Sequence, residues 1–232
     1  MSRSFRTLYF KAKDKYVMPV LLKNKQKIFC IGKNKTGTTS LTKAILDLGY
    51  IIGDQRKAER LIDYYKIRDF KQIIAYCKTA EFFQDVPFSW PFTFIAMDVA
   101  FPGSKFILTI RDSAEQWYNS LIKFHSHFWG ESEVPTKEQL QNVTYCYKGW
   151  VWKANQILYN APEDNPYQKD ILINDYETHN LLVQKYFHYR QNDLLVLNIA
   201  QPDAYIKLCE FLKQKPLYER MPWKNKLPEK NI

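Results

Sequence analysis

Residues 27–41 read KIFCIGKNKTGTTSL, a short apolar run followed by a loop that contains two glycines. The run at residues 28–31 has the composition of a strand that is covered on both faces. Apolar residues then recur with helical spacing from Leu41 to Leu48. A strand that leads through a tight loop into a helix directs several free backbone N–H groups to one point. The stretch therefore predicts an anion-binding site.

The two glycines of this loop, Gly32 and Gly37, are separated by four residues, as in the phosphate-binding loop G-x-x-x-x-G-K-[ST]. Thr38 stands where that loop requires Lys, and the available lysine, Lys35, precedes the second glycine. The order K-T-G-T-T-S-L at residues 35–41 instead resembles the 5′-phosphosulfate loop of the sulfotransferases, which use 3′-phosphoadenosine-5′-phosphosulfate (PAPS). Taken alone, the loop also fits an ordinary glycine-containing turn between a strand and a helix.

The composition is that of a folded domain, with 232 residues of which 46% are hydrophobic and 16% aromatic. We expect no transmembrane helix, because no apolar run is long enough to span a bilayer. The basic N-terminus lacks the apolar segment and the cleavage site of a signal peptide. The four cysteines are far apart and show no C-x-x-C spacing, which predicts reduced thiols, mostly in the core, and a cytoplasmic location.

The net charge of +10 favours an anionic partner. Lysine and arginine are spread along the chain, and no known nucleic-acid-binding motif accompanies them. We therefore expect a polyanionic or bisphosphate ligand and no nucleic acid. The sequence leaves the oligomeric state open.

A second strand-to-helix unit follows at residues 105–120. Residues 105–110, KFILTI, form the clearest strand of the chain, and the next ten residues read RDSAEQWYNS. Ser113 with Gln116, or Asp112 with Glu115, would form a capping box at the start of a helix. Arg111 is thereby placed at the end of the strand, next to the turn.

This unit extends the resemblance to the sulfotransferases. They place an Arg at the end of such a strand and a Ser eight residues later, and both hold the 3′-phosphate of PAPS. Arg111 matches, but Asn119 is eight residues on and the serine follows one position later, at Ser120. We interpret this shift as a one-residue insertion, because residues 117–120, WYNS, are similar to the W-Y-x-S run of some members. Asn119 is the alternative contact.

Two residues are candidates for a general base. Residues 80–84 predict a buried strand that ends at Asp85, and ligands gather at the carboxyl ends of strands in open α/β sheets. A cap of the turn before Pro87 is the competing interpretation of Asp85. His125, near the end of the second helix, is the other candidate, although a histidine there is favourable without any function. His125 and His127 diverge on a helix, so we predict no metal site.

The remaining segments complete a P-loop-like three-layer α/β fold, with a central, mainly parallel sheet flanked by helices. We expect one domain over residues 1–232, with a core at 27–226 and an N-terminal extension or short edge strands at 1–26. Residues 55–79 predict two helices, residues 135–160 one long aromatic helix, and residues 194–199 a third clear strand before a terminal helix. Residues 221–226, which include Lys224, resemble the basic C-terminal segment that can return to the nucleotide in sulfotransferases.

The resemblance implies transfer of a sulfuryl group from PAPS to a hydroxyl or amine by in-line displacement, with adenosine 3′,5′-bisphosphate (PAP) as the product. The acceptor would be a small molecule, a glycan or a lipid, and no metal is required. Lys35 would stabilise charge on the leaving phosphate oxygen. The residues that would hold the nucleotide around it are Lys35, Thr36, Gly37, Thr38, Thr39 and Ser40.

Two other functions fit parts of the sequence. A phosphotransferase with an altered loop would hold Mg²⁺ at Asp85 or Asp112, but the lysine expected after Gly37 is missing. A non-catalytic basic module that binds glycan, nucleic acid or a membrane surface would explain the charge. It would not explain the two strand-to-helix units.

Overall fold

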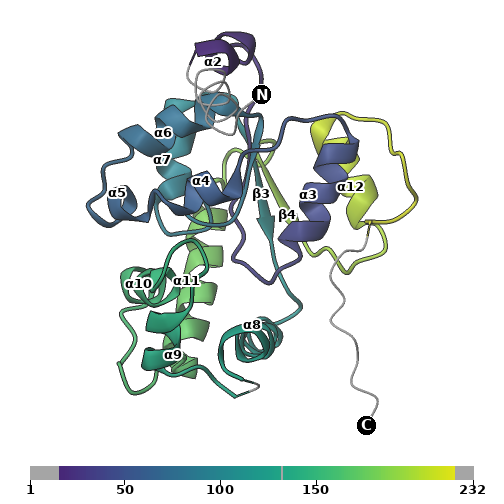
Figure 1. Ribbon diagram of the computed structural model, residues 1–232. Helices are drawn as coiled ribbons and strands as arrows, with labels where there is room; N and C mark the ends of the chain where they lie inside the picture. Colours follow the sequence, from purple (N-terminus) through teal and green to yellow (C-terminus); the bar gives the residue numbers. More distant parts are fainter. Residues whose placement is uncertain (1–15, 132, 223–232) are drawn as a thin grey trace, which may run out of the picture.

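The computed structural model describes residues 16–131 and 133–222. A four-stranded sheet lies at its centre (Figure 1), formed by β1 (Ile28–Cys30), β2 (Phe82–Phe83), β3 (Lys105–Thr109) and β4 (Leu194–Leu197). The strand order is β2-β1-β3-β4 and every neighbouring pair is parallel. All four carboxyl ends therefore meet at one edge of the sheet, where ligands collect in open α/β folds.

Two helices, α3 (Thr38–Asp47) and α12 (Ala204–Leu212), cover one face of the sheet (Figure 1). They pack on alternate strand residues, Ile28 and Cys30 of β1 and Ile107 of β3. This alternation follows from the strand geometry, in which successive side chains point to opposite faces.

The other face carries a larger core, centred on Phe29 of β1 and filled by aromatic side chains. The Phe29 ring stacks at 5.5 Å on Phe83 and at 5.5 Å on Phe106. Helices over the rest of the chain contribute to this core: α4 (Gln55–Glu59), α5 (Ile62–Lys66), α6 (Lys71–Tyr76), η2 (Cys77–Thr79), α7 (Thr93–Ala100), α8 (Ala114–Trp129), α9 (Lys137–Asn142), α10 (Trp150–Leu158) and α11 (Lys169–Tyr186). The predicted three-layer α/β fold is confirmed.

The N-terminal part differs from the prediction of edge strands. Residues 18–21 form a short helix, α2 (Met18–Leu21), with Met18 and Leu22 buried. Pro19 stands in its first turn, where the missing N–H would have no partner in any case. Of the two alternatives for residues 1–26, short edge strands are therefore wrong for residues 16–26. Residues 1–15 lie outside the described part.

The aromatic segment at residues 135–160 also differs, because it forms two helices, α9 and α10, instead of one. Gly149 precedes α10 in the left-handed region, with φ of 77°. A β-carbon there would lie 3.2 Å from the Gln141 carbonyl oxygen. Both helices direct apolar residues such as Leu140 and Trp150 into one core. The apolar pattern therefore continues across the segment between the two helices, and the sequence predicted one helix.

All four cysteines are buried and unpaired. Within residues 16–131 and 133–222, no helix combines the length and the apolar character that crossing a membrane requires.

Gly32 joins β1 to the following loop, and we expect Gly32→Ala to destabilise the fold strongly. A β-carbon there would lie 2.2 Å from the Thr109 hydroxyl oxygen and 2.3 Å from its carbonyl oxygen. Backbone cannot yield as a flexible side chain can, so we expect a loss of about 3 kcal/mol or more in the free energy of unfolding. Urea unfolding measures it. Gly103→Ala is the control, since open space surrounds that site and only its φ of 80° is strained, at about 1–2 kcal/mol. Equal losses would contradict the close packing of Gly32.

Candidate functional site

The loop between β1 and α3 is fixed by its own side chains. The Thr36 hydroxyl donates to the Lys33 carbonyl oxygen at 2.5 Å and lies 2.6 Å from the Thr109 hydroxyl at the end of β3. Thr36 is buried, so its side chain holds the loop in shape. Its predicted contact with the nucleotide stays a prediction. Lys35 adopts φ of 64° and Gly37 φ of 95°, both in the left-handed region. Such strain in a non-glycine residue is typical of functional sites.

The N-terminus of α3 supplies backbone donors. The first helical bond runs from the Leu41 N–H to the Gly37 carbonyl oxygen, at 3.1 Å, and the Ser40 N–H donates to the same oxygen at 3.0 Å. The amides of Thr38 and Thr39 come before these bonds and are oriented outward along the helix axis. They are the donors that this helix start offers to an anion, while the Ser40 amide is engaged within the helix.

Arg111, at the end of β3, contacts the loop directly. Its Nε–H donates to the Lys35 carbonyl oxygen at 2.7 Å, and its backbone N–H donates to the Tyr176 hydroxyl at 2.9 Å. No described residue accepts a hydrogen bond from its two terminal nitrogens. Burial lowers the pKa of Arg111 from its ordinary value, although a guanidinium keeps its charge in proteins. Arg111 therefore holds the loop with one donor and offers the others.

Helix α8 places its side chains along the same loop. Ser113 caps its N-terminus by accepting the Gln116 N–H at 3.0 Å. The predicted capping box is only half formed, because Gln116 Oε1 accepts the N–H of Asp112 and not that of Ser113. The Trp117 indole N–H donates to the Asn34 carbonyl oxygen at 2.9 Å, and the Phe124 ring centre lies 3.2 Å from Lys35 Nζ.

Ser120 lies on this loop-facing side of α8, three residues after Trp117 and four before Phe124. Residues at these spacings share one face of a helix. Ser120 is half-buried, whereas Asn119 is exposed. The loop-facing side of α8 therefore includes the predicted serine and not its alternative.

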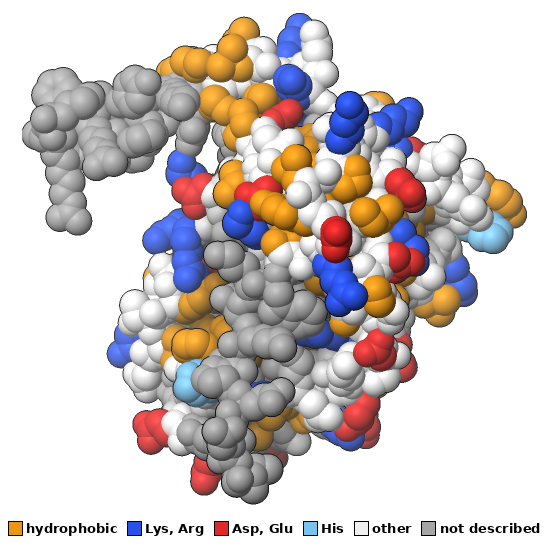
Figure 2. Space-filling model, turned by 90° about the vertical axis from the view of Figure 1, so that its right-hand side faces the viewer, with side chains coloured by type: hydrophobic (Ala, Val, Ile, Leu, Met, Phe, Trp, Pro, Cys, Tyr) orange, Lys and Arg blue, Asp and Glu red, His pale blue; other side chains and the backbone are white. Residues whose placement is uncertain are grey.

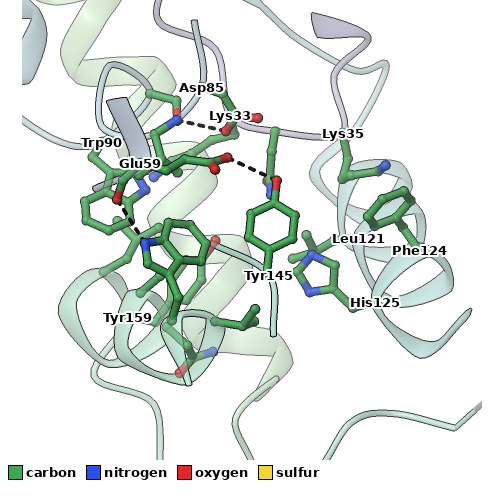
Figure 3. A pocket seen from close by; sticks show the side chains of 18 of the residues that line it. Lys33, Lys35, Glu59, Asp85, Trp90, Leu121, Phe124, His125, Tyr145 and Tyr159 are labelled. Atoms are coloured by element: carbon green, nitrogen blue, oxygen red, sulfur yellow. Dashed lines mark hydrogen bonds between the residues drawn. The ribbon is translucent and has the colours of Figure 1, made fainter. Parts of the chain in front are cut away.

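The loop opens into a cavity of about 240 Å³, shown in Figure 3. Lys35, Thr38 and Thr39 line one side of it, and Asp85 and His125 line it as well. The predicted loop lysine and both predicted bases are thus brought together. Aromatic rings form much of the remaining wall: Trp90, Phe124, Trp129, Tyr145, Trp150, Tyr159 and Tyr167.

Asp85 follows β2 with φ of 55° and accepts the Val86 N–H at 3.0 Å. Burial, followed by the nearby Glu59 carboxylate, raises the pKa of Asp85 to about 6. Desolvation and a like charge both disfavour the ionised form of a carboxyl group. Asp85 can therefore take up and release a proton close to neutral pH.

Burial also lowers the pKa of Lys35 to about 8, and the Arg111 charge adds to this effect while Asp85 opposes it. His125 is affected more strongly, since burial and the Lys35 charge lower its pKa to about 3. Its Nδ1 lies 2.8 Å from the Tyr167 hydroxyl. At neutral pH the cavity therefore holds a charged Lys35 and a neutral His125.

Two buried polar groups beside the cavity were not predicted. Glu59 on α4 accepts hydrogen bonds from Arg56 Nη1 at 2.8 Å and from the Tyr145 hydroxyl at 3.0 Å. Lys33 is buried and forms an ion pair with Asp175 of α11 at 2.5 Å. Burial lowers the pKa of Lys33, and Asp175 opposes this shift. The sequence feature that could have pointed to Lys33 is its position directly after Gly32, at the start of the loop.

The remaining candidates lie elsewhere. Asp112 is exposed and accepts hydrogen bonds from Asn198 at 2.6 Å and Gln116 at 3.0 Å. It does not line the cavity, so Asp85 and Asp112 do not share it. Lys224 lies outside the described residues. In the described part of the chain, no three His, Cys, Asp or Glu side chains are grouped so as to hold a metal ion.

Comparison with known proteins agrees with this geometry. The sequence model of the sulfotransferase domain family matches residues 27–230. The match includes the loop after β1, Asp85 and the unit formed by β3 and α8. A search of curated proteins found no match. Since the family model spans most of the chain, the chain belongs to the sulfotransferase domain family.

Proposed function

We propose that this protein transfers a sulfuryl group from PAPS to a hydroxyl or amine of a small acceptor that binds in the cavity. One observation carries the proposal. Lys35 and Thr38 of the predicted phosphosulfate loop line the same cavity as Asp85, a carboxyl group whose pKa is about 6. The cavity therefore contains both a charged hydrogen-bond donor for the leaving phosphate, Lys35, and a base for the acceptor proton, Asp85.

The nucleotide would lie along the two strand-to-helix units. The outward amides of Thr38 and Thr39 would receive the 5′-phosphosulfate, as a helix N-terminus does for anions. The free guanidinium nitrogens of Arg111 would grip the 3′-phosphate. We assign the second 3′-phosphate contact to Ser120 because it faces the loop, and Asn119 does not. Lys224 keeps its predicted role as an expectation.

The chemistry is a displacement at sulfur. The bond from sulfur to the 5′-phosphate oxygen breaks, and a bond from sulfur to the acceptor oxygen or nitrogen forms. The Lys35 ammonium stabilises the charge that builds on the departing phosphate oxygen, as in other loose transfers of this type. The ionised Asp85 takes the acceptor proton. We expect the reaction to proceed without added metal.

The cavity favours a small acceptor over a glycan or lipid chain. An apolar cavity of about 150 Å³ holds one benzene ring, so the 240 Å³ here fits one ring with substituents. Seven of the described residues that line it are aromatic, which suits a flat apolar ring by stacking.

We further propose that residues 27–226 form the core of one domain.

Incubation with ³⁵S-labelled PAPS and a panel of small phenols, alcohols and amines tests the proposed function. We expect label in an organic product together with release of PAP. Release of phosphate from ATP with Mg²⁺, and no transfer of label to any compound, would assign the site to a phosphotransferase instead.

The pH dependence of kcat/KM for PAPS should be bell-shaped, with limbs near the pKa values of Asp85 and Lys35. Asp85 must be ionised, so the rate falls as the pH drops below about 6. Lys35 must be protonated, so the rate also falls as the pH rises above about 8. Steady-state rates measured across this range report groups of the free enzyme.

The acid limb separates the two candidate bases. A base at His125, whose pKa is about 3, would leave the rate flat from pH about 4 to about 7. Asp85→Asn should lower the rate and abolish the limb near pH 6, whereas His125→Gln should keep that limb. A limb that survives in Asp85→Asn would remove Asp85 from the role of base.

A further inference from the structure

The short helix α2 exposes apolar side chains on the side that faces away from the fold. Met18 and Leu22 are buried beneath it, but Val17 is 47% exposed, Val20 74% and Leu21 64%. These three residues follow an i, i+3, i+4 spacing and so share one face. A helix that is apolar all round is normally buried on every side. We therefore expect the exposed outer face of α2 to contact another surface.

Three exposed lysines lie beside α2, around a recess that Val17, Val20 and Leu21 do not line. Lys23 and Lys25 follow α2, and together with Lys78 of η2 they line a recess of about 430 Å³ beside Pro19 and Phe101. All three lysines are exposed. No Asp or Glu among the described residues lines the recess. A fourth lysine of the lining, Lys27, is buried and donates to the Ala80 carbonyl oxygen at 2.6 Å.

Figure 2 shows hydrophobic side chains at the top of the molecule, the end where Figure 1 places α2, with lysine or arginine side chains close by. This end is opposite to the candidate active site. The recess includes Lys27 and Ser104, which directly precede β1 and β3, whereas the cavity lies at the carboxyl ends of the strands.

We propose that this face, formed by Val17, Val20 and Leu21 with Lys23, Lys25 and Lys78, docks the protein on an anionic lipid bilayer. Protruding apolar side chains enter the boundary between headgroups and acyl chains, and the lysines contact lipid phosphates and carboxylates. The strong exposure of Val20 and Leu21 suits insertion. Among the residues that the structure describes, no acidic side chain lines the recess, which suits an anionic surface. In this orientation the cavity faces away from the bilayer, so the acceptor enters from the aqueous side.

Co-sedimentation of the full chain with vesicles tests the proposal. We expect binding to equimolar phosphatidylcholine and phosphatidylserine, little binding to phosphatidylcholine alone, and a clear loss when salt rises from about 0.1 M to about 0.5 M. Lys23→Gln with Lys25→Gln should weaken partitioning about 25-fold, since each lysine near such a surface is worth about five-fold. Val20→Ser with Leu21→Ser should weaken it about 10-fold or more.

The matched control removes two exposed lysines elsewhere, Lys66 on α5 and Lys148 between α9 and α10, by the change to Gln. It should alter partitioning less than about two-fold. An equal loss in both lysine pairs would mean attraction by net charge alone and would overturn the proposal. So would equal binding to neutral vesicles, or binding of polyglutamate with the same dependence on Lys23 and Lys25, which would indicate an acidic protein partner. Because the assay contains no nucleotide, its outcome is independent of the proposed sulfuryl transfer.

Discussion

Lys35→Ala is expected to lower the single-turnover rate with PAPS about 10²- to 10³-fold, the cost of removing one preorganised donor to a developing anion. The Lys35 ammonium lines the cavity, lies 3.2 Å from the Phe124 ring centre and has a pKa of about 8. Its partner charge is largest in the transition state, so its loss affects the chemical step more than ground-state binding. Nucleotide affinity, measured by calorimetric titration, should therefore fall far less than the rate.

Lys43→Ala is the matched control for this variant. Lys43 lies on α3, the helix that follows the loop of Lys35, and forms an i, i+4 ion pair with Asp47. It does not line the cavity. Its loss should leave the single-turnover rate within about two-fold of the parent, because a surface pair contributes little. A Lys35→Ala protein that also stays within a few-fold of the parent would remove Lys35 from the catalytic role.

Arg111→Ala should weaken PAP far more than adenosine 5′-phosphosulfate, which lacks the 3′-phosphate. A hydrogen bond to a charged group contributes about 1.5–3 kcal/mol, which corresponds to a loss of roughly 10- to 150-fold for PAP beyond any loss for the other ligand. Both ligands should lose some affinity, because the Arg111 Nε–H also holds the Lys35 carbonyl oxygen at 2.7 Å. The ratio of the two affinities, measured by calorimetry, isolates the contact with the 3′-phosphate.

Trp117→Phe provides the control for the structural part of this effect. It removes the indole N–H that donates to the Asn34 carbonyl oxygen at 2.9 Å, together with part of a buried ring, and it leaves the Arg111 side chain in place. This change should weaken both nucleotides alike and leave their ratio unchanged. If Arg111→Ala also left the ratio unchanged, Arg111 would be a loop-positioning residue and not the 3′-phosphate contact.

Local sequence signals were sufficient for the parts of the site that follow a strand. The apolar runs before Gly32 and Arg111 predicted β1 and β3, and both strands have the lengths expected from those runs to within one residue. Their parallel pairing then places Lys35 and Arg111 side by side, with the Arg111 side chain on the Lys35 carbonyl. Neighbouring parallel strands end at the same edge, so this proximity follows from topology.

Contacts between segments far apart in the chain could not be predicted. Glu59 and Tyr145 are 86 residues apart, and nothing local to either residue signals their hydrogen bond. The left-handed turn at Gly149 was also missed, because the helices on both sides of it bury aromatic residues in the same core. The roles of individual site residues and the cytoplasmic location stay predictions.

The binding of PAP without metal tests the central claim most directly. At 100 times its dissociation constant, a ligand that binds only the native state adds about 2.7 kcal/mol to the free energy of unfolding. We predict a rise of this size in chemical unfolding experiments with PAP and a chelator, and a markedly smaller rise for Arg111→Ala at the same PAP concentration. No stabilisation by PAP, together with a Mg²⁺-dependent stabilisation by ATP, would contradict the assignment of this site to PAPS-dependent sulfuryl transfer.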